Sequence, residues 1–327
     1  MVPFASRKRL QQDWPKLHKV CGNLAFVQLG DVEVRPKAWD GVPGYVLSAM
    51  RGISSLRLVQ LEVSHSPPPR TLFSRPATPP LFPPDLRHLC LSSVHLRDIP
   101  SISVLPPAQH FQLTILSLTD LTIAGLTPDN LQTLSFIRTL ITTTAPSLRA
   151  LHYTHRRDIA NAIPEPSLLN DISFPSLRIL SVALADFPTS IFSAAPQLVH
   201  LSLTLGDLLR AHRPVPRAMA SLHAYQAIEA ALLADPQQGE EAAADGNDST
   251  AEPAAAARAL QVLEVPLRFA GFMEQELNLF QRAKQKREEL VELARAKGVE
   301  VRLVNFGNDE PEERFRRTVR EVLKERV

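Results

Sequence analysis

The sequence is poor in the residues on which several common kinds of protein depend. It has two cysteines, Cys21 and Cys90, too few for a small secreted scaffold held together by several disulfides. Glycine is scarce, at 12 of 327 residues, and neither a dinucleotide-binding fingerprint nor a P-loop occurs. The Gly-x-Ser-x-Gly motif of hydrolases is also missing. We therefore expect no enzymatic activity, no cofactor and no bound metal.

The chain has no excess of charge of one sign and no long apolar run. Its 36 basic and 34 acidic residues give a net charge of +2, so no global field favours nucleic acid or an anionic membrane. No run reaches the roughly 18 apolar residues that a membrane-crossing helix needs. The basic start, residues 1–9, is not followed by the apolar stretch of a signal peptide. We expect a protein of the cytoplasm or the nucleus that does not contact membranes.

What the chain does contain is a recurring six-residue phrase with apolar residues at its first, fourth and sixth positions. The clear copies begin at Leu86, Leu113, Leu131, Leu148, Leu177, Leu198 and Leu260. Weaker copies cover residues 24–29, 56–61 and 296–301. Alternate residues of a strand share one face. The phrase therefore predicts a short strand whose fourth and sixth residues face a core.

This phrase resembles the strand segment of leucine-rich repeats, especially the divergent repeats of fungal-type F-box proteins, over residues 20–305. The resemblance implies an α/β solenoid, or horseshoe, with a parallel concave β-sheet and a helical or irregular outer face. One coil buries too few leucines to offset its conformational entropy. We therefore expect the coils to be stable only when stacked around a continuous core. An F-box module is not recognisable before Leu24.

The segments around the phrases predict three parts of the chain. These are a lead-in segment at 1–20, the repeat solenoid at 21–305 and a C-terminal helix at 306–327. Two interruptions are expected inside the solenoid, a Pro-rich loop at 66–84 and a disordered acidic and Ala-rich insertion at 235–257.

Apolar residues at helical spacing predict several helices on the outer face. The expected helices cover residues 38–52, 188–195, 217–234, 274–298 and 312–326, and a terminal strand covers 299–304. Gly298 is expected to end the long helix at a C-cap position. Because an open solenoid exposes its core at the end, we expect the C-terminal segment 274–327 to act as a cap.

The variable positions of the phrase predict a binding surface on the concave side of the sheet. The candidate partner-binding residues are His88, Cys90, Ser117, Ser135, His152, Ser181, His200 and Ser202. These residues are small or uncharged, while Glu264 and Glu300 make the C-terminal end acidic. A centre with little charge and a polar rim is typical of protein-binding surfaces. Parallel sheets also favour small and β-branched residues for structural reasons alone.

The sequence thus predicts a non-enzymatic protein–protein interaction module, a scaffold that binds a protein on its concave face. If the resemblance extends to role, it implies substrate recognition for a cullin-type ubiquitin ligase, reached through the Skp adaptor. One alternative is a regulator of an enzyme, such as a GTPase activator that uses an exposed arginine; Arg97, Arg138 and Arg157 are candidates. Another is nucleic-acid binding through the basic segments 282–287 and 314–320, which the balanced charge does not favour.

Overall fold

The chain forms two compact units, Met1–Thr144 and Ala145–Val327. The computed structural model describes residues 26–29, 42–43, 47, 52–60, 62–64, 81–83, 85–97, 111–119, 121–124, 130–154, 167–205, 215–234, 259–267, 277–305 and 311–324.

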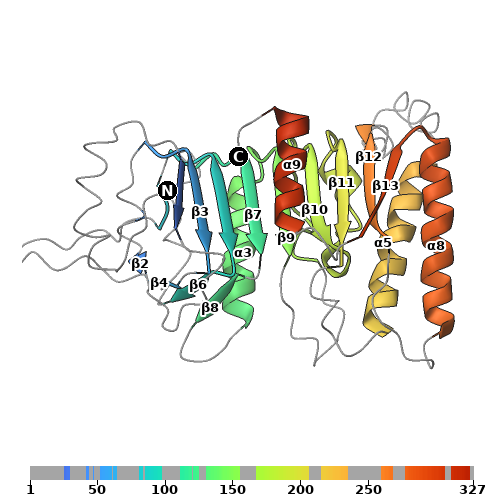
Figure 1. Ribbon diagram of the computed structural model, residues 1–327, viewed down its shortest axis with the longest axis horizontal. Helices are drawn as coiled ribbons and strands as arrows, with labels where there is room; N and C mark the ends of the chain where they lie inside the picture. Colours follow the sequence, from blue (N-terminus) through green and yellow to red (C-terminus); the bar gives the residue numbers. More distant parts are fainter. Residues whose placement is uncertain are drawn as a thin grey trace, which may run out of the picture. The chain divides into compact units, whose positions relative to one another are not determined.

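The first unit contains a parallel sheet in which the repeated phrases lie side by side (Figure 1). Its strands, in spatial order, are β1 (Phe26–Leu29), β3 (Ser55–Val59), β5 (His88–Ser92) and β7 (Ile115–Thr119). The register aligns Leu56 with Leu89 and Leu89 with Leu116, and all three side chains are buried. Equivalent leucines of successive phrases therefore form one continuous apolar layer.

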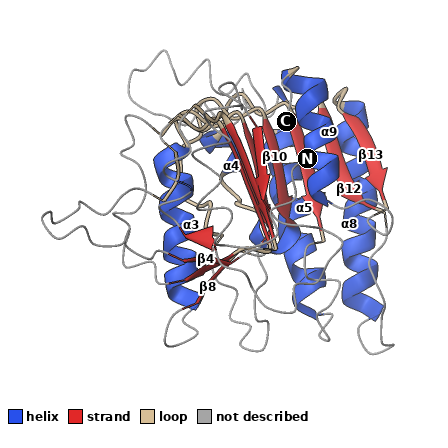
Figure 2. Cartoon of the chain, turned by 60° about the vertical axis from the view of Figure 1, so that its left-hand side comes forward, coloured by secondary structure: helices blue, strands red, loops and turns tan. Residues whose placement is uncertain are grey.

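A second, smaller parallel sheet in the same unit follows the first at a tight corner. Its strands are β2 (Val42–Pro43), β4 (Glu62–Ser64), β6 (His95–Arg97) and β8 (Thr122–Ala124). Gln60 and Ser93 stand at two of the corners with positive φ angles of 50° and 51°. Their backbone N–H groups donate to Ser92 O and Thr119 O, at 2.9 and 2.8 Å. These bonds tie each corner to the next coil. Helix α3 (Asn130–Thr144) packs against β8 (Figure 2).

The second unit repeats the parallel arrangement. Its strands, in spatial order, are β9 (Ala150–Thr154), β10 (Ile179–Ala183), β11 (His200–Thr204), β12 (Val262–Pro266) and β13 (Glu300–Val304). The aligned, buried core residues are Leu151, Leu180, Leu201 and Leu263. At the strand entries, Arg178 N donates to Arg149 O and Val199 N donates to Arg178 O, both at 2.9 Å. The same bond thus recurs from coil to coil.

The helices of the second unit lie between its strands in the sequence, except the last, which follows β13. They are η3 (Leu184–Asp186), α4 (Ile191–Ala194), α5 (Val215–Leu233), α8 (Leu277–Ala296) and α9 (Pro311–Leu323). Helices α5 and α8 lie side by side, and α8 contacts β13 (Figure 1). Leu222 of α5 packs against Phe280 and Ala283 of α8, and Lys286 forms an ion pair with Glu229.

These observations establish an α/β protein with parallel strands in register and a solenoid-like succession of coils. Within the described ranges, no helix combines the length and the apolar character that crossing a bilayer requires.

The structure contradicts the strand predicted for one phrase and changes the predicted register of two others. Residues 131–136 belong to helix α3 and form no strand, so the strand prediction there was wrong. The phrase has apolar residues at i and i+3, which suits a helix as well as a strand, and the buried residues Phe136, Ile137, Leu140 and Ile141 continue at helical spacing. The weak copy at 56–61 begins three residues too late, because Leu56 and Leu58 face the core. The weak copy at 296–301 is also misplaced, since Val301 aligns with Leu263.

The predicted helices have mixed outcomes. Helices α4, α5 and α8 and the terminal strand β13 confirm the expected segments at 188–195, 217–234, 274–298 and 299–304. Gly298 ends α8 with a φ angle of +79°. Within 38–52 the structure places strand β2 at 42–43, which contradicts a continuous helix.

Other predicted segments lie outside the described residues. These are the lead-in at 1–20, the insertion at 235–257 and most of the Pro-rich loop at 66–84. Of that loop, Leu81, Phe82 and Pro83 are described and buried, and the Phe82 ring stacks on Phe111 with centroids 6.2 Å apart.

The last helix confirms its predicted place in the sequence, and within the predicted cap at 274–327 it is α8 that contacts the terminal strand β13. Helix α9 covers Pro311–Leu323, and it packs against β9 and β10 instead of stacking on the terminal strand β13 (Figure 1). The cap was expected because β13 ends the series of strands. The strongly amphipathic helix instead buries Phe315, Val319 and Leu323.

Candidate functional site

The parallel register brings one variable position of five successive phrases into a single polar row. The row runs across the second unit's sheet through His152, Ser181, Ser202, Glu264 and Arg302. We call the side of the sheet that carries this row the unit-2 polar face. The core leucines alternate with these residues along each strand and so point to the other side.

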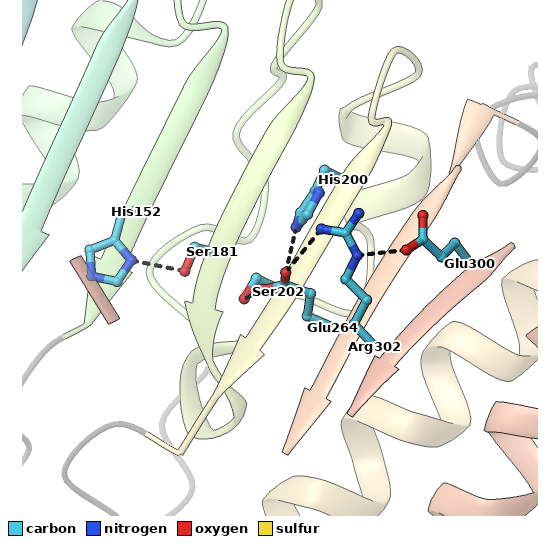
Figure 3. A network of polar contacts seen from close by, with 7 residues as sticks. All are labelled: His152, Ser181, His200, Ser202, Glu264, Glu300 and Arg302. Atoms are coloured by element: carbon cyan, nitrogen blue, oxygen red, sulfur yellow. Dashed lines mark hydrogen bonds and ion pairs between the residues drawn. The ribbon is translucent and has the colours of Figure 1, made fainter. Parts of the chain in front are cut away.

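The row begins with a buried hydrogen bond between two strands. His152 Nδ1 lies 2.9 Å from Ser181 Oγ, although the two residues are 29 positions apart in sequence (Figure 3). Burial lowers the pKa of His152 to about 4, against an opposing effect of the nearby Glu312 carboxylate. The imidazole is therefore neutral at physiological pH. Its contact with Ser181 is a neutral hydrogen bond.

The middle of the row is a buried carboxylate with three polar neighbours. Ser202 Oγ donates to Glu264 Oε2 at 2.8 Å, and His200 Nε2 lies 3.5 Å from Glu264 Oε1 (Figure 3). Arg302 Nη1 lies 3.9 Å from the same oxygen. Burial alone would raise the pKa of Glu264, but the hydrogen bonds from His200 and Ser202 and the charge of Arg314 lower it overall. Glu264 therefore stays ionised inside the protein.

The row ends at solvent on strand β13. Arg302 Nε donates to Glu300 Oε1 at 2.7 Å, and both side chains are exposed. The hydrogen bond and the charge of Arg302 hold the pKa of Glu300 below its usual range. This charged pair forms the accessible rim of the unit-2 polar face.

The other end of the row is covered by the chain's own helix α9. The Phe315 ring lies 5.3 Å from the His152 ring, and Phe315 is 2% exposed. Glu312 is also buried, and its Oε1 atom lies 3.4 Å from Nε of Arg316 in the same helix. His152 is fully buried and Ser181 nearly so. This part of the predicted binding surface is thus occupied within the molecule.

The first unit has a corresponding row, which we call the unit-1 polar face. It aligns Gln28, Arg57, Cys90 and Ser117, and Arg57 Nη1 donates to Gln28 Oε1 at 3.2 Å. His88 lies on the same side of β5 as Cys90. His88 and Cys90 are half-buried, while Ser117 is 3% exposed.

Seven of the eight predicted binding residues lie on the two polar faces, and the eighth lies on neither. His88, Cys90 and Ser117 lie on the unit-1 polar face. His152, Ser181, His200 and Ser202 lie on the unit-2 polar face. Ser135 lies on neither, because it is an exposed residue of helix α3, so its predicted place in the sheet was wrong.

Three residues of these surfaces were missed from the sequence. The misplaced phrases at 56–61 and 296–301 put Gln60 and Glu300 at their fifth, variable position. Arg57 and Arg302 were therefore not recognised as row residues. Phe315 belongs to the predicted helix at 312–326, but no sequence signal shows which strands a helix covers. The alternation of Leu56 with Leu58 and of Val301 with Leu303 would have corrected both registers.

The side chains gathered on these faces are polar and charged groups that form hydrogen bonds with one another. In the described part of the chain, no group of three or more His, Cys, Asp or Glu residues is placed to hold a metal ion. The Ser181–His152 contact resembles the start of a nucleophile–base pair, but both side chains are buried beneath α9. Comparisons with family models, with curated proteins and with solved structures give no match to this chain.

Proposed function

We propose that the chain is a leucine-rich-repeat protein that binds another protein through its polar faces and carries out no chemistry of its own. The observation that carries this proposal is the in-register row of variable side chains on parallel strands backed by buried leucines. The leucines are constrained because they fill the core. Row positions that are partly exposed, such as Arg57 and Cys90, do not fill the core and can carry the side chains that a partner requires. This is how stacked repeats build extended binding surfaces.

The unit-1 polar face supplies the more accessible contact region. Phe26 and His88 share one row of this face, and Arg57 and Cys90 share the next. Phe26 is 47% exposed, and Arg57, His88 and Cys90 are partly exposed. Aromatic residues and arginine are the types that contribute most to protein–protein binding energy. We infer that a partner contacts these residues first.

A narrower form of the proposal is that the partner is a substrate delivered to a cullin-type ubiquitin ligase, in the cytoplasm or the nucleus. It is supported by the resemblance of the phrases to those of fungal-type F-box proteins. It requires recovery of the Skp adaptor together with the chain. Recovery of other partners without this adaptor would support a free-standing scaffold.

The test is affinity purification of the full chain with quantitative mass spectrometry, using two arginine variants. Cys90→Arg places a bulky charge in the centre of the unit-1 polar face. Ser135→Arg is the matched control, because Ser135 is exposed on α3 of the same unit. Specific partners should fall at least about tenfold with Cys90→Arg, the effect of losing about 1.4 kcal/mol of binding energy.

The control should retain those partners at the wild-type level. The proposal is contradicted if Cys90→Arg, shown to be folded by circular dichroism, retains every partner that Ser135→Arg retains. A loss caused equally by both variants would also count against it, since the binding surface would then not be the polar face.

A further inference from the structure

Helix α9 shows what kind of ligand the unit-2 polar face accepts. The helix lies on the side of the sheet that carries His152, and its aromatic residue Phe315 rests on that imidazole. Arg314, the residue before it, is close enough to Glu264 to stabilise the buried carboxylate. The face thus binds an aromatic ring beside a cation.

The surface beneath α9 has the shape and polarity of a helix-binding site. Ala150, Ile179 and Ala183 flank the His152–Ser181 pair on the same side of the strands and are buried. They are small or apolar, so a helix can approach closely. Glu264 adds one negative charge at the side. A complementary ligand is an amphipathic helix with an aromatic residue next to an arginine.

The sheet does not depend on α9 for its own hydrogen bonds. Strands β9, β10 and β11 bond to one another through their backbones, and their leucines are buried on the other side of the sheet. Charged side chains of α9 pair within the helix, since Arg316 lies near Glu312 and Glu313, and Arg320 lies near Glu313. The helix is only 13 residues long, which is marginal for a helix without tertiary contacts. It can therefore leave the face without dismantling the strands.

We propose that the unit-2 polar face is a helix-binding surface that α9 occupies in cis, and that an amphipathic helix of a partner protein, with an aromatic residue beside an arginine, displaces α9. The inference rests on the proposed function in that it names the partner's binding element. A tethered segment competes at an effective concentration of the order of millimolar. A partner replaces α9 when the ratio of its concentration to its Kd exceeds the ratio of this effective concentration to the Kd of α9 for the face. Partners with a smaller ratio are excluded.

The experiment measures binding of a fluorescent peptide with the sequence of residues 311–323 to the full chain by anisotropy. The wild-type chain should bind it weakly, because α9 fills the face. Phe315→Asp removes the aromatic contact with His152, and this variant should bind the peptide at least about tenfold more tightly. Arg320→Asp places the same charge on the exposed side of α9 and should bind like the wild type.

Two further variants localise the binding. Adding Ser181→Arg to the Phe315→Asp chain should abolish peptide binding, whereas adding Ser135→Arg should not. A peptide that itself carries Phe315→Asp should not bind. Because Phe315→Asp could disturb folding, Phe315→Ala is measured in parallel, and circular dichroism must show that both variants keep their helix and strand content.

The inference is overturned if the folded Phe315→Asp and Phe315→Ala chains bind the peptide no more tightly than the wild type. It is also overturned if the wild-type chain is a dimer that exchanges α9, because the occupant would then be a second copy. Failure of the proposed function is distinguishable. The peptide would bind as expected while Cys90→Arg and the α9 variants left every cellular partner unchanged.

Discussion

At the scale of single residues, His152 links the sheet to the helix that covers it. Its ring shares a hydrogen bond with Ser181 across the sheet, lies tilted against the Phe315 ring of α9 and is near the Glu312 carboxylate. A buried imidazole that is kept neutral makes the folded state sensitive to acid. Protonation would place a charge on a fully buried ring, and this desolvation outweighs the attraction of the Glu312 carboxylate.

We predict that the free energy of unfolding falls as the pH is lowered from 6.5 to about 4. The pKa of His152 is 6.5 when solvated and about 4 in the folded chain, so between these values the unfolded chain binds a proton that the folded chain does not. The contribution of neutral His152 to the free energy of unfolding is complete above pH 6.5. Lowering the pH from 6.5 to about 4 removes about 3 kcal/mol of it. Urea unfolding of the wild type and of His152→Asn at both ends of this range measures it. Equal pH dependence in the two proteins would contradict the account.

The buried carboxylate of Glu264 permits a second prediction. Glu264→Gln keeps the shape of the side chain but removes the charge that faces His200, Ser202 and Arg302. We expect a loss of about 1–3 kcal/mol in the free energy of unfolding, the usual effect of weakening a buried, charge-assisted hydrogen bond. Glu300→Gln is the control. Its side chain is exposed, so the change should leave the urea midpoint close to that of the wild type. Similar losses for both variants would show that the row is not a buried network.

At the scale of elements, strands were predictable where the phrase was complete. The copies beginning at Leu86, Leu113, Leu148, Leu177 and Leu198 all enter strands with the expected inward residues. The copy at Leu131 failed because apolar residues three apart fit both periods. It also stands unusually close to the copies on either side, and that crowding was the available signal that it is not a separate coil.

The binding surface was less predictable than the strands. Sequence alternation correctly placed residues such as Cys90 and Ser202 opposite the core. It could not show that α9 lies on His152 and Ser181, because amphipathicity identifies the apolar side of a helix without identifying what it covers. Long-range packing of this kind is fixed by the complete fold.

Two serines that the sequence treats as equivalent provide the third prediction. Ser135→Arg should change the free energy of unfolding by less than about 0.5 kcal/mol, because Ser135 is exposed on a helix and arginine is a good helix former. Ser181→Arg should cost at least about 1 kcal/mol, because the guanidinium would be desolvated beneath α9 or would expel it. Urea midpoints compare the two. A larger cost at Ser135 would restore the strand prediction.

At the scale of the whole molecule, stability arises from stacked coils. A core residue of an interior strand is covered by neighbouring coils on both sides, whereas a core residue of the terminal strand is covered on one side only. Leu180 of β10 is fully buried between its neighbours, while Leu303 of the terminal strand β13 is 43% exposed. Leu180→Ala should therefore cost about 2–5 kcal/mol, and Leu303→Ala less than about 1 kcal/mol. Thermal unfolding of both variants checks this. Equal costs would contradict a stacked core with an open end.

The same architecture relates stability to recognition. Each unit keeps its leucines on one side of a parallel sheet and presents a row of varied polar side chains on the other. The basic residues that suggested nucleic-acid binding are partly neutralised by neighbours, such as Lys284 by Glu288 and Arg316 by Glu312. We propose that a protein partner binds these faces and that α9 marks where part of it would bind.

The most direct measurement is a double-mutant cycle between His152 and Phe315, because the account depends on α9 binding the unit-2 polar face. Unfolding free energies are measured for the wild type, His152→Ala, Phe315→Ala and the double variant. We predict a coupling energy of about 1 kcal/mol, typical of contacting aromatic rings. The pair Phe315 and Glu292, which is exposed on α8, should show none. Additive effects of His152→Ala and Phe315→Ala would contradict the account, since α9 would then not rest on the polar face.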